Sequence, residues 1–372
     1  MNTAAATRGR SERRYSARDI TVLEGLDPVR KRPGMFIGGV GSAGLHHLIW
    51  EILDNAVDEA MNGFASEIGV TLHKDGTSIT VTDNGRGIPV DIHPRYKKSA
   101  LEIILTTLHA GAKFDPRAAG YKTAGGLHGV GASVVNALSK QLVATIRRGG
   151  VEYRMSFKSG KPQGKLKSVG KVRGTGTTIY FHPDPTTFPK TELDAQVIHD
   201  RLEVTSYLHK GIKVTFDDQA AGSKHCFQHN EGIVEYLEKI LIDRRAKSVH
   251  GAPFAMERGD GVKIEMVLKW TESTDELLCS YVNGIPTPSG GTHENGLRAG
   301  LTKAVRNYIE THQLAPRGVK IAHEDIREGL VGVLSVFMHD PQFQGQTKDR
   351  LNNPELQQIL DAAVRPVLEQ WL

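Results

Sequence analysis

The first residues with the means to do chemistry lie in one helical stretch, HHLIWEILDNAVDEA, residues 46–60. Helix positions four apart lie above one another, so His47, Glu51 and Asn55 form one polar row. A histidine beside a glutamate could hold a general base, and the amide oxygen of Asn55 suits a hard cation such as Mg²⁺. The pattern also fits a solvated helix face, and the helix alone does not decide between the two.

A second candidate is VTDNGRGIP, residues 81–89. Asn-Gly after an alternating strand predicts a hairpin turn, but the residues that follow do not alternate as a returning strand would. Asp83, at the strand end, could accept a hydrogen bond from an exocyclic amine, which would let a site choose adenine. Gly87 would let a ligand approach the backbone closely. On this motif alone, a turn and a ligand site stay equally open.

A third candidate is AGGLHGVGASVVNALS, residues 124–139. Glycines directly before a helix leave amide donors free at its positive end, which favours a phosphate. The stretch is not a Walker loop, because no GK[ST] follows, and a long loop rather than a strand precedes it, which excludes a dinucleotide fingerprint. Lys113 and Lys122 in the same loop would add positive charge. A flexible linker is the alternative.

Lys348 in PQFQGQTKDRL, residues 341–351, is the fourth candidate. A lysine in a polar loop is usually solvated, but this one could place a charge on a terminal phosphate if its loop meets the first site. Two other chemistries, that of a zinc protease and that of a serine hydrolase, are disfavoured because their motifs are lacking. HENGL and HEDIR lack the second histidine of HExxH, and the sequence has no GxSxG serine elbow.

The composition is that of an ordinary globular chain. Its 372 residues, 39% hydrophobic and 24% charged, predict two domains and a sizeable core. The net charge of +5 mildly favours an anionic partner. Cys226 and Cys279 are far apart without a CxxC, which fits a reducing cytoplasm. Without a long apolar run we expect no membrane span, and residues 1–14 are expected to be a disordered basic arm.

The elements that must position the candidate groups follow from periodicity. Residues 45–61 predict a helix, and residues 65–85 a hairpin whose second strand ends at Asp83. The polar segment 219–232 is the candidate domain boundary. The mix of helices and mostly antiparallel strands predicts two α+β domains. Further strands are expected at 142–148, 151–159, 175–183 and 211–218, with a helix at 192–209.

The order of the motifs resembles the GHKL ATPase superfamily: acidic helix, DNGRG, glycine-rich loop, Thr-Gly-Thr strand. Longer motifs resemble the ATPase region of bacterial type IIA topoisomerase B subunits over nearly the whole chain after Tyr15. The resemblance implies a GHKL (Bergerat) α/β sandwich with an N-terminal dimerisation arm over 15–230. A smaller α+β transducer domain with a ribosomal-protein-S5-like fold would follow over 231–372. The motifs are YSARDITVLEGLDPVRKRPGMFIG, GLHHLIWEILDNAVDEA, GGLHGVGASVVNALS, GGTHENGLRAGLTKAV, IREGL and DPQFQGQTK.

The resemblance also implies catalytic roles. Glu51 would be the general base that activates the attacking water, and His47 would orient it. Asn55 would be the Mg²⁺ ligand. Gln346 and Lys348 would sense the γ-phosphate from the second domain. The other acids of the helix are expected to be scaffold (Asp54, Asp58) or solvated (Glu59).

The remaining implied roles concern the nucleotide pocket. Asp83 would accept from the adenine amine, helped by Thr177. Arg148 would stand at the pocket mouth, where aminocoumarin inhibitors compete with ATP. Tyr15 and Ile20 would belong to an arm that reaches the partner subunit. Gly87, Ile88 and Pro89 would line the base pocket, and Lys113, Tyr121, Gly125, Gly126, Leu127, His128, Gly129, Val130 and Gly131 would form the lid over the phosphates.

The implied function is ATP binding and hydrolysis with Mg²⁺ by a gyrase-type B subunit. Nucleotide would drive homodimerisation and close a gate on double-stranded DNA, so that the full enzyme with its A subunit supercoils DNA.

The ParE subunit of topoisomerase IV is the alternative. A sensor kinase is disfavoured because QTK and GGTH are present. Since the chain has no EGDSA-like motif, we expect it alone to hydrolyse ATP without cleaving DNA. The basic LIDRRAK segment faces that DNA or is solvated.

Overall fold

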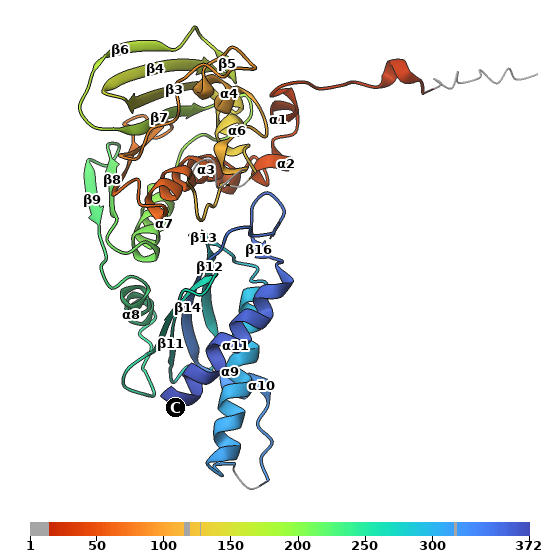
Figure 1. The fold of residues 1–372 in the computed structure, drawn as a ribbon, viewed down its shortest axis with the longest axis vertical. Coiled ribbons are helices and arrows are strands. Elements are labelled where there is room, and N and C mark those ends of the chain that lie inside the picture. The colour runs from red at the N-terminus through yellow and green to blue at the C-terminus, as the bar shows by residue number, and fades with distance from the viewer. Residues whose placement is uncertain (1–14, 115–119, 127, 316–317) are drawn as a thin grey trace, which may run out of the picture.

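The computed structural model describes residues 15–114, 120–126, 128–315 and 318–372. They form two layered α+β parts, one above the other along the longest axis of the molecule (Figure 1). The upper part in this view carries a nine-stranded sheet, and the lower part a five-stranded sheet. Within the described residues, no helix has both the length and the apolar character that crossing a bilayer requires.

The larger sheet is mixed but mostly antiparallel. Its order is β5-β4-β3-β7-β2-β1-β8-β9, with β6 paired to β4, and β1 runs parallel to β8. Burial alternates along the inner strands, as expected where helices cover one face. The strands are β1 (Glu67–Leu72), β2 (Ile79–Asp83), β3 (Ser139–Arg148), β4 (Val151–Lys158), β5 (Lys161–Pro162), β6 (Lys167–Lys171), β7 (Gly176–Pro183), β8 (Lys213–Asp218) and β9 (Ser223–Phe227).

The helix α3 (Ser42–Met61) carries the predicted acidic row and packs on β1, β2 and β7. Its apolar residues recur every three or four positions and join the core, which leaves the opposite, polar face for a site. The other helical segments of this part are α1 (Asp27–Lys31), α2 (Gly34–Ile37), α4 (Ala100–Thr106), α6 (Gly131–Ala137), α7 (Ala195–Leu208) and the 3₁₀ turns Ala17–Asp19 and Ala112–Phe114.

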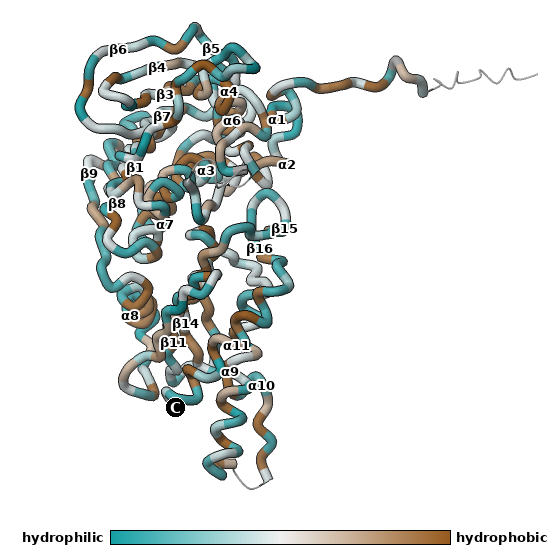
Figure 2. The backbone as a smooth tube through the Cα atoms, viewed as in Figure 1, coloured by the Kyte–Doolittle hydropathy of each residue, from teal (hydrophilic) through white to brown (hydrophobic). Residues whose placement is uncertain are grey.

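The smaller sheet is covered on both faces. Its order is β10-β11-β14-β12-β13. Alternate residues of β14 point to different apolar clusters, one with α9 and α11 and the other with α8, and hydrophobic residues recur along these helices (Figure 2). The elements are α8 (Ile233–Asp243), β10 (Phe254–Arg258), β11 (Lys263–Trp270), β12 (Leu277–Val282), β13 (Ile285–Pro286), α9 (Thr292–Thr311), α10 (His323–Arg327), β14 (Leu330–Phe337), β15 (Phe343–Gln344), β16 (Arg350–Leu351) and α11 (Pro354–Trp371).

The turn between β12 and β13 reaches the larger part. Asn283 Nδ2 donates to the carbonyl oxygens of Ala124 at 2.7 Å and Met338 at 2.9 Å. Ile285 lies against Gly125, whose added Cβ would come within 2.9 Å of its Cδ1. The small sheet is therefore in direct contact with the glycine-rich loop of the larger one.

The α+β prediction is confirmed. Segment 219–232, the candidate domain boundary, contains the edge strand β9, which was not predicted and pairs antiparallel with β8. Ser223, His225 and Phe227 alternate with more exposed residues, a pattern that the many polar side chains hid. Strands β5, β6 and β10 were also not predicted, since β5 and β6 are short and exposed.

Candidate active site

A cavity of about 440 Å³ opens beside the polar face of α3. Segments far apart in the sequence line it: residues within 51–59, 81–89, 104–113, 121–132 and 346–348, together with Arg148, Thr177 and Ile179. Most of the predicted site residues meet here. They are Glu51, Asn55, Asp83, Gly87, Ile88, Pro89, Lys113, Tyr121, Gly126, His128, Gly129, Val130, Gly131, Arg148, Thr177, Gln346 and Lys348.

The base candidate is fixed on both sides. His47 Nε2 lies 3.0 Å from Glu51 Oε1, one helical turn away. A Cβ added to Gly131 would stand 2.0 Å from Glu51 Oε2, so only glycine at the start of α6 leaves room for this carboxylate. Burial raises the pKa of Glu51, but Lys348 and His47 outweigh it and hold the pKa at about 2. Glu51 is thus a buried, oriented carboxylate.

The small part supplies a buried cation to this cavity. Lys348 is 3% exposed, and its Nζ lies 3.7 Å from Asp54 Oδ2. Burial lowers the pKa of Lys348, but Glu51, Asp54 and Asp58 raise it above its ordinary value, so the amine stays charged. Gln346 Oε1 lies 3.0 Å from His128 Nδ1. The QTK loop therefore does meet the first site.

The backbone amides of the glycine-rich loop donate hydrogen bonds to one carboxylate, that of Asp58. Asp58 is 1% exposed and accepts from the amides of Gly125 at 2.7 Å and Gly126 at 3.1 Å. Lys113 Nζ donates to Asp58 Oδ2 at 2.5 Å and to Asn55 Oδ1 at 2.7 Å. Backbone amides and a lysine are the groups that phosphates also use, so a phosphate would compete with Asp58 for them.

The far end of the cavity is built around Asp83. Its Oδ1 accepts from the amides of Gly85 at 2.8 Å and Thr177 at 3.3 Å, and no described group donates to Oδ2. Burial raises the pKa of Asp83 to about 6, although the two backbone bonds oppose this. Gly87 has a φ of +75°, and a Cβ there would lie 2.8 Å from the carbonyl of Arg147. This pocket thus offers one buried acceptor between close-packed backbone.

Each of the two parts of the chain matches a known protein family. The family described as DNA gyrase B matches residues 232–372, and the family of histidine kinase-, DNA gyrase B- and HSP90-like ATPases matches residues 41–187. The solved 43K ATPase domain of Thermus thermophilus gyrase B, in complex with an aminocoumarin, is 37% identical with a TM-score of 0.77. The match covers 93% of this chain and 89% of that one. The chain belongs to the DNA gyrase B family.

Two further relatives match nearly the whole chain. The DNA gyrase B protein of Thermotoga maritima is 43% identical over 96% of this chain and 57% of that protein. The topoisomerase IV ATP-binding domain of Francisella tularensis, in complex with a small-molecule inhibitor, is 38% identical, with 94% and 92% of the two chains covered and a TM-score of 0.77. The gyrase B chain thus spans about half the length of the curated relatives it matches and contains their GHKL ATPase region, which implies ATP binding.

One residue of the gyrase B helix was wrongly expected to be solvated. The side chain of Glu59 is 12% exposed and accepts from Arg86 Nη2 at 2.7 Å and from the Tyr121 hydroxyl. Arg86, which was not predicted, stacks over the Phe64 ring at 3.5 Å. The sequence did contain a signal that Glu59 faces the site, because Glu59 continues the polar row of the helix one turn (i, i+4) beyond Asn55.

Several predicted residues of the gyrase B site do not line the cavity. His47 lies behind Glu51, and Gly125 is buried between the loop and Ile285. Tyr15 is 82% and Ile20 58% exposed, away from the cavity of their own chain. Leu127 lies outside the described residues, as does the predicted arm over 1–14.

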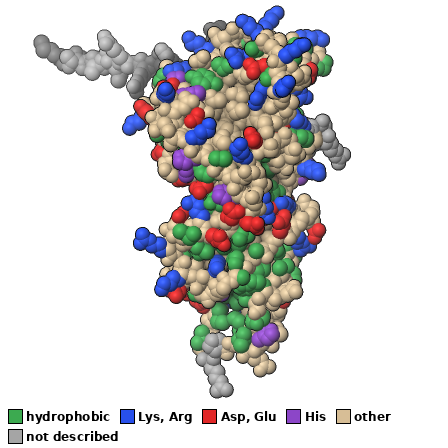
Figure 3. Space-filling model, turned by 90° about the vertical axis from the view of Figure 1, so that its left-hand side faces the viewer, with side chains coloured by type: hydrophobic (Ala, Val, Ile, Leu, Met, Phe, Trp, Pro, Cys, Tyr) green, Lys and Arg blue, Asp and Glu red, His purple; other side chains and the backbone are tan. Residues whose placement is uncertain are grey.

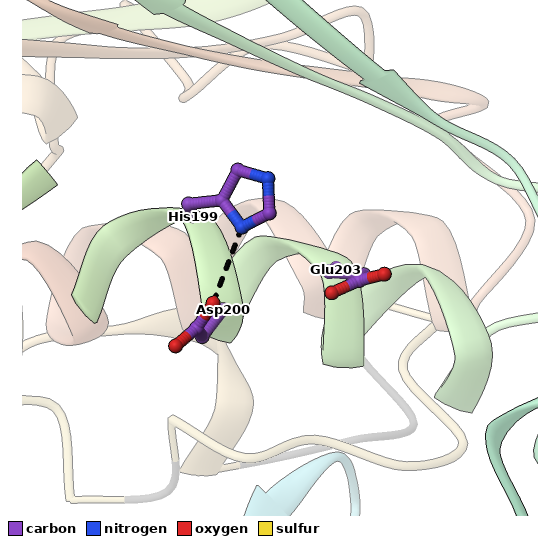
Figure 4. A group of neighbouring side chains, drawn as sticks. All are labelled: His199, Asp200 and Glu203. Carbon is purple, nitrogen blue, oxygen red and sulfur yellow. Dashed lines mark hydrogen bonds and ion pairs between the residues drawn. The ribbon is translucent and has the colours of Figure 1, made fainter. Parts of the chain in front are cut away.

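A second group of ligand-type side chains lies on α7 of the gyrase B chain, where His199, Asp200 and Glu203 offer atoms within 4.8 Å of one another (Figure 4). They already have partners: His199 Nδ1 is 3.2 Å from Asp200 Oδ1, and Glu203 lies 3.8 Å from Lys239. None of them lines the nucleotide cavity. This group has no part in the site.

Proposed function

We propose that this gyrase B region binds and hydrolyses ATP with Mg²⁺. One observation carries the proposal: Glu51, oriented by His47, shares a cavity with the buried Lys348 of the other part. Phosphoryl transfer to water needs an oriented water, a proton acceptor and positive charge at the terminal phosphate. Glu51 would accept the proton, and Lys348 would supply the charge.

The electrostatics favour a base that ATP itself activates. With Lys348 next to it, Glu51 has a pKa of about 2 and is a weak base. A terminal phosphate near Lys348 would share that positive charge and bring negative charge beside Glu51. Both effects raise the basicity of the carboxylate. Proton abstraction would then be efficient only when the triphosphate is in place.

The donor set fits Mg²⁺. Asn55 Oδ1 faces Lys113 Nζ at 2.7 Å, so this amide oxygen already has a cation as its partner. Mg²⁺ keeps several waters and commonly takes few protein ligands plus phosphate oxygens, and it would neutralise charge on the phosphates. Asn55 would be its protein ligand here, with Lys113 moving to the phosphates.

Recognition of the rest of the nucleotide would use the far pocket and the glycine-rich loop. Oδ2 of Asp83, to which no described residue donates, would accept the adenine amine, and Thr177, Gly87, Ile88 and Pro89 would surround the base. Arg148 Nη1 donates to the carbonyl of Gly87 at 2.8 Å, which fixes the mouth where aminocoumarins would bind. The amides of 125–131, with Lys113 and Tyr121, would close over the phosphates.

The larger assembly is part of the same proposal. Residues 15–230 would be the ATPase domain and 231–372 the transducer. The exposed Tyr15 and Ile20 would reach a second copy when ATP binds, so that a homodimer closes on double-stranded DNA. Together with the gyrase A subunit in the cytoplasm, the complete protein would drive negative supercoiling. LIDRRAK, residues 241–247, would face that DNA.

ATP turnover of the parent chain and of Glu51→Ala, measured over a range of protein concentrations, tests the proposal. A general base contributes about 10²- to 10⁴-fold, so the variant should lose at least about 100-fold in kcat while still binding ATP. Turnover per chain should rise with protein concentration if a dimer is the active form. Equal turnover by the two proteins would refute the role of Glu51.

The second candidate is the ParE subunit of topoisomerase IV, because the Francisella domain matches this fold as well as the Thermus gyrase does. ATP turnover cannot separate the two. The complete protein, assembled with its A subunit, should introduce negative supercoils into relaxed plasmid. Decatenation without supercoiling would favour topoisomerase IV.

A further inference from the structure

One edge of the larger sheet carries an excess of positive charge. Between residues 153 and 183 the sequence has no Asp or Glu. The same span holds seven cationic residues, here named the basic edge: Arg154, Lys158, Lys161, Lys165, Lys167, Lys171 and Arg173. All seven are exposed, and Lys and Arg side chains gather at the end of the molecule where β4 to β6 lie (Figure 3).

The charges of the basic edge are not neutralised by the protein. Arg154 lies 3.4 Å from Glu152 on the same strand, and the two side chains are 53% and 24% exposed. The other six form no ion pair with any described residue. Exposed pairs contribute little, so the whole edge faces solvent as a positive surface. It includes no residue that lines the nucleotide cavity.

Two pairs of like charges lie directly opposite each other in the ladder. Arg154 on β4 pairs with Lys167 on β6, and Lys158 on β4 pairs with Lys161 on β5. Directly opposed side chains in an antiparallel pair are about 5 Å apart at Cβ, and like charges in these positions destabilise the sheet. Lysine on an edge strand prevents sheet-to-sheet aggregation, but alternating signs would do so without this repulsion.

The arrangement suits an extended polyanion. Lys167 and Lys171 are four residues apart on β6, at most about 13 Å at 3.3 Å per residue. The register shift between them places Lys167 opposite Arg154 and Lys171 opposite Val151, on different faces of the ladder, so one small anion would not bind both. Protein interfaces are depleted in lysine and usually contain aromatic anchors, whereas phosphate backbones are bound by lysine and arginine. The sequence of residues 1–14 has four arginines and one acid, so a partner's arm would be repelled from this edge.

We propose that the basic edge binds the phosphate backbone of duplex DNA. The choice of DNA rests on the proposed function, while the site is separate from the nucleotide cavity. Contacts to phosphates carry no sequence information, so binding would be independent of sequence and strongly dependent on salt. The edge would hold DNA against the ATPase part.

Fluorescence anisotropy with a labelled duplex of about 20 base pairs, titrated at several salt concentrations, tests this. The edge variant carries Lys161→Gln, Lys165→Gln, Lys167→Gln and Lys171→Gln. Each lost phosphate contact lowers the slope of log K against log salt by about 0.9, so the slope should fall by up to about 3.6. At fixed low salt, binding should weaken at least tenfold.

A matched control has the same net charge as the edge variant. It carries Lys74→Gln, Lys190→Gln, Lys224→Gln and Lys320→Gln, four exposed lysines elsewhere. It should keep the parent's slope, and both variants should keep the parent's ATP turnover. Unchanged turnover also separates this test from that of Glu51.

Three results would overturn the proposal. If the edge variant binds DNA like the parent and only aggregates more readily in light scattering, the lysines serve edge protection. If the control loses as much binding as the edge variant, only the overall charge matters. If polyglutamate displaces the duplex at equal charge concentration, the partner is an acidic protein.

Discussion

The two sides of the active site are built differently. On the side of α3 and β2, the functional groups bind one another or the backbone: His47 with Glu51, and Asp83 with the amides of Gly85 and Thr177. On the side of the loops, the functional groups bind acids of the first side. Lys113 lies on Asp58, and Lys348 lies near Asp54.

This difference distinguishes groups that are already in position before ATP binds from groups that would change their partners when ATP binds. Groups oriented by their own helix and strand need no rearrangement during the reaction, which is the efficient way to hold a base and an adenine acceptor. The cations and amides of the loops are of the kind that bind phosphate, and their present partners are carboxylates. Nucleotide would replace those carboxylates, so binding changes the loop side and leaves the helix side in place.

Among changes to the helix side, the largest effect is expected at Gly131. In Gly131→Ala the new Cβ would overlap Glu51 Oε2, so the carboxylate must rotate away from its place beside His47. A displacement of about 1 Å can cost about 100-fold, and we expect a fall in kcat of that order with little change in KM. Gly251→Ala, whose Cβ would meet nothing within 4 Å, is the control and should match the parent in steady-state kinetics.

A smaller effect is expected at Asp83. Asp83→Asn removes a charged acceptor worth about 1.5–3 kcal/mol, so the Kd for ATP should rise about 10- to 100-fold. In the parent, ATP affinity should fall as the pH drops through about 6, because protonation removes that acceptor. The variant should lack this pH dependence in calorimetric titrations. An identical pH profile in both proteins would contradict the assignment.

The contribution of Asp83 to folding stability changes with pH in the opposite direction to its contribution to ATP affinity. Its pKa in the folded protein, about 6, lies above the ordinary 3.8, so the folded state binds the proton more readily. This stabilisation is fully present below about pH 3.8 and is lost as the pH rises through about 6. ATP affinity and this part of the stability should therefore move in opposite directions over that range.

The smallest effect is expected where Asp58 of α3 holds the donors of the loops. Asp58→Asn weakens the bonds from the loop amides and Lys113, and a loss of about 1–2 kcal/mol would lower the Tm without nucleotide by about 2–8 °C. Because ATP would take over those donors, the loss should shrink when ATP is added in a thermal melt. Asp200→Asn, on the exposed side of α7, is the control. An equal loss with and without ATP would show that Asp58 is not exchanged.

The fold and the position of the acidic helix were accessible from the sequence because they rest on local patterns, whereas Tyr121, Arg148, Thr177 and Gln346 were named only from the resemblance. The apolar period of α3 placed Glu51 and Asn55 on one face, and alternation ended β2 at Asp83, as observed. The short strands β5 and β6 were missed because their residues are exposed and charged. Periodicity reports burial, and these strands have almost none.

The sequence predicted where the site residues lie along the chain better than it predicted which side chains they contact. The resemblance placed Lys348 near the site, but nothing in the sequence indicated that Asp54 would hold it at 3.7 Å. Glu59 was expected in solvent because its partners, Arg86 and Tyr121, arrive from other segments. Long-range pairing depends on tertiary packing, which a local pattern does not contain.

The central claim is that the second part of the chain completes a site whose other side is already built. Measuring ATP binding and turnover on one preparation of Lys348→Met tests it most directly. Because Lys348 would stabilise charge on the terminal phosphate, kcat should fall about 10²- to 10³-fold while the Kd for ATP changes far less. A variant that turns over ATP at the parent's rate would contradict the claim.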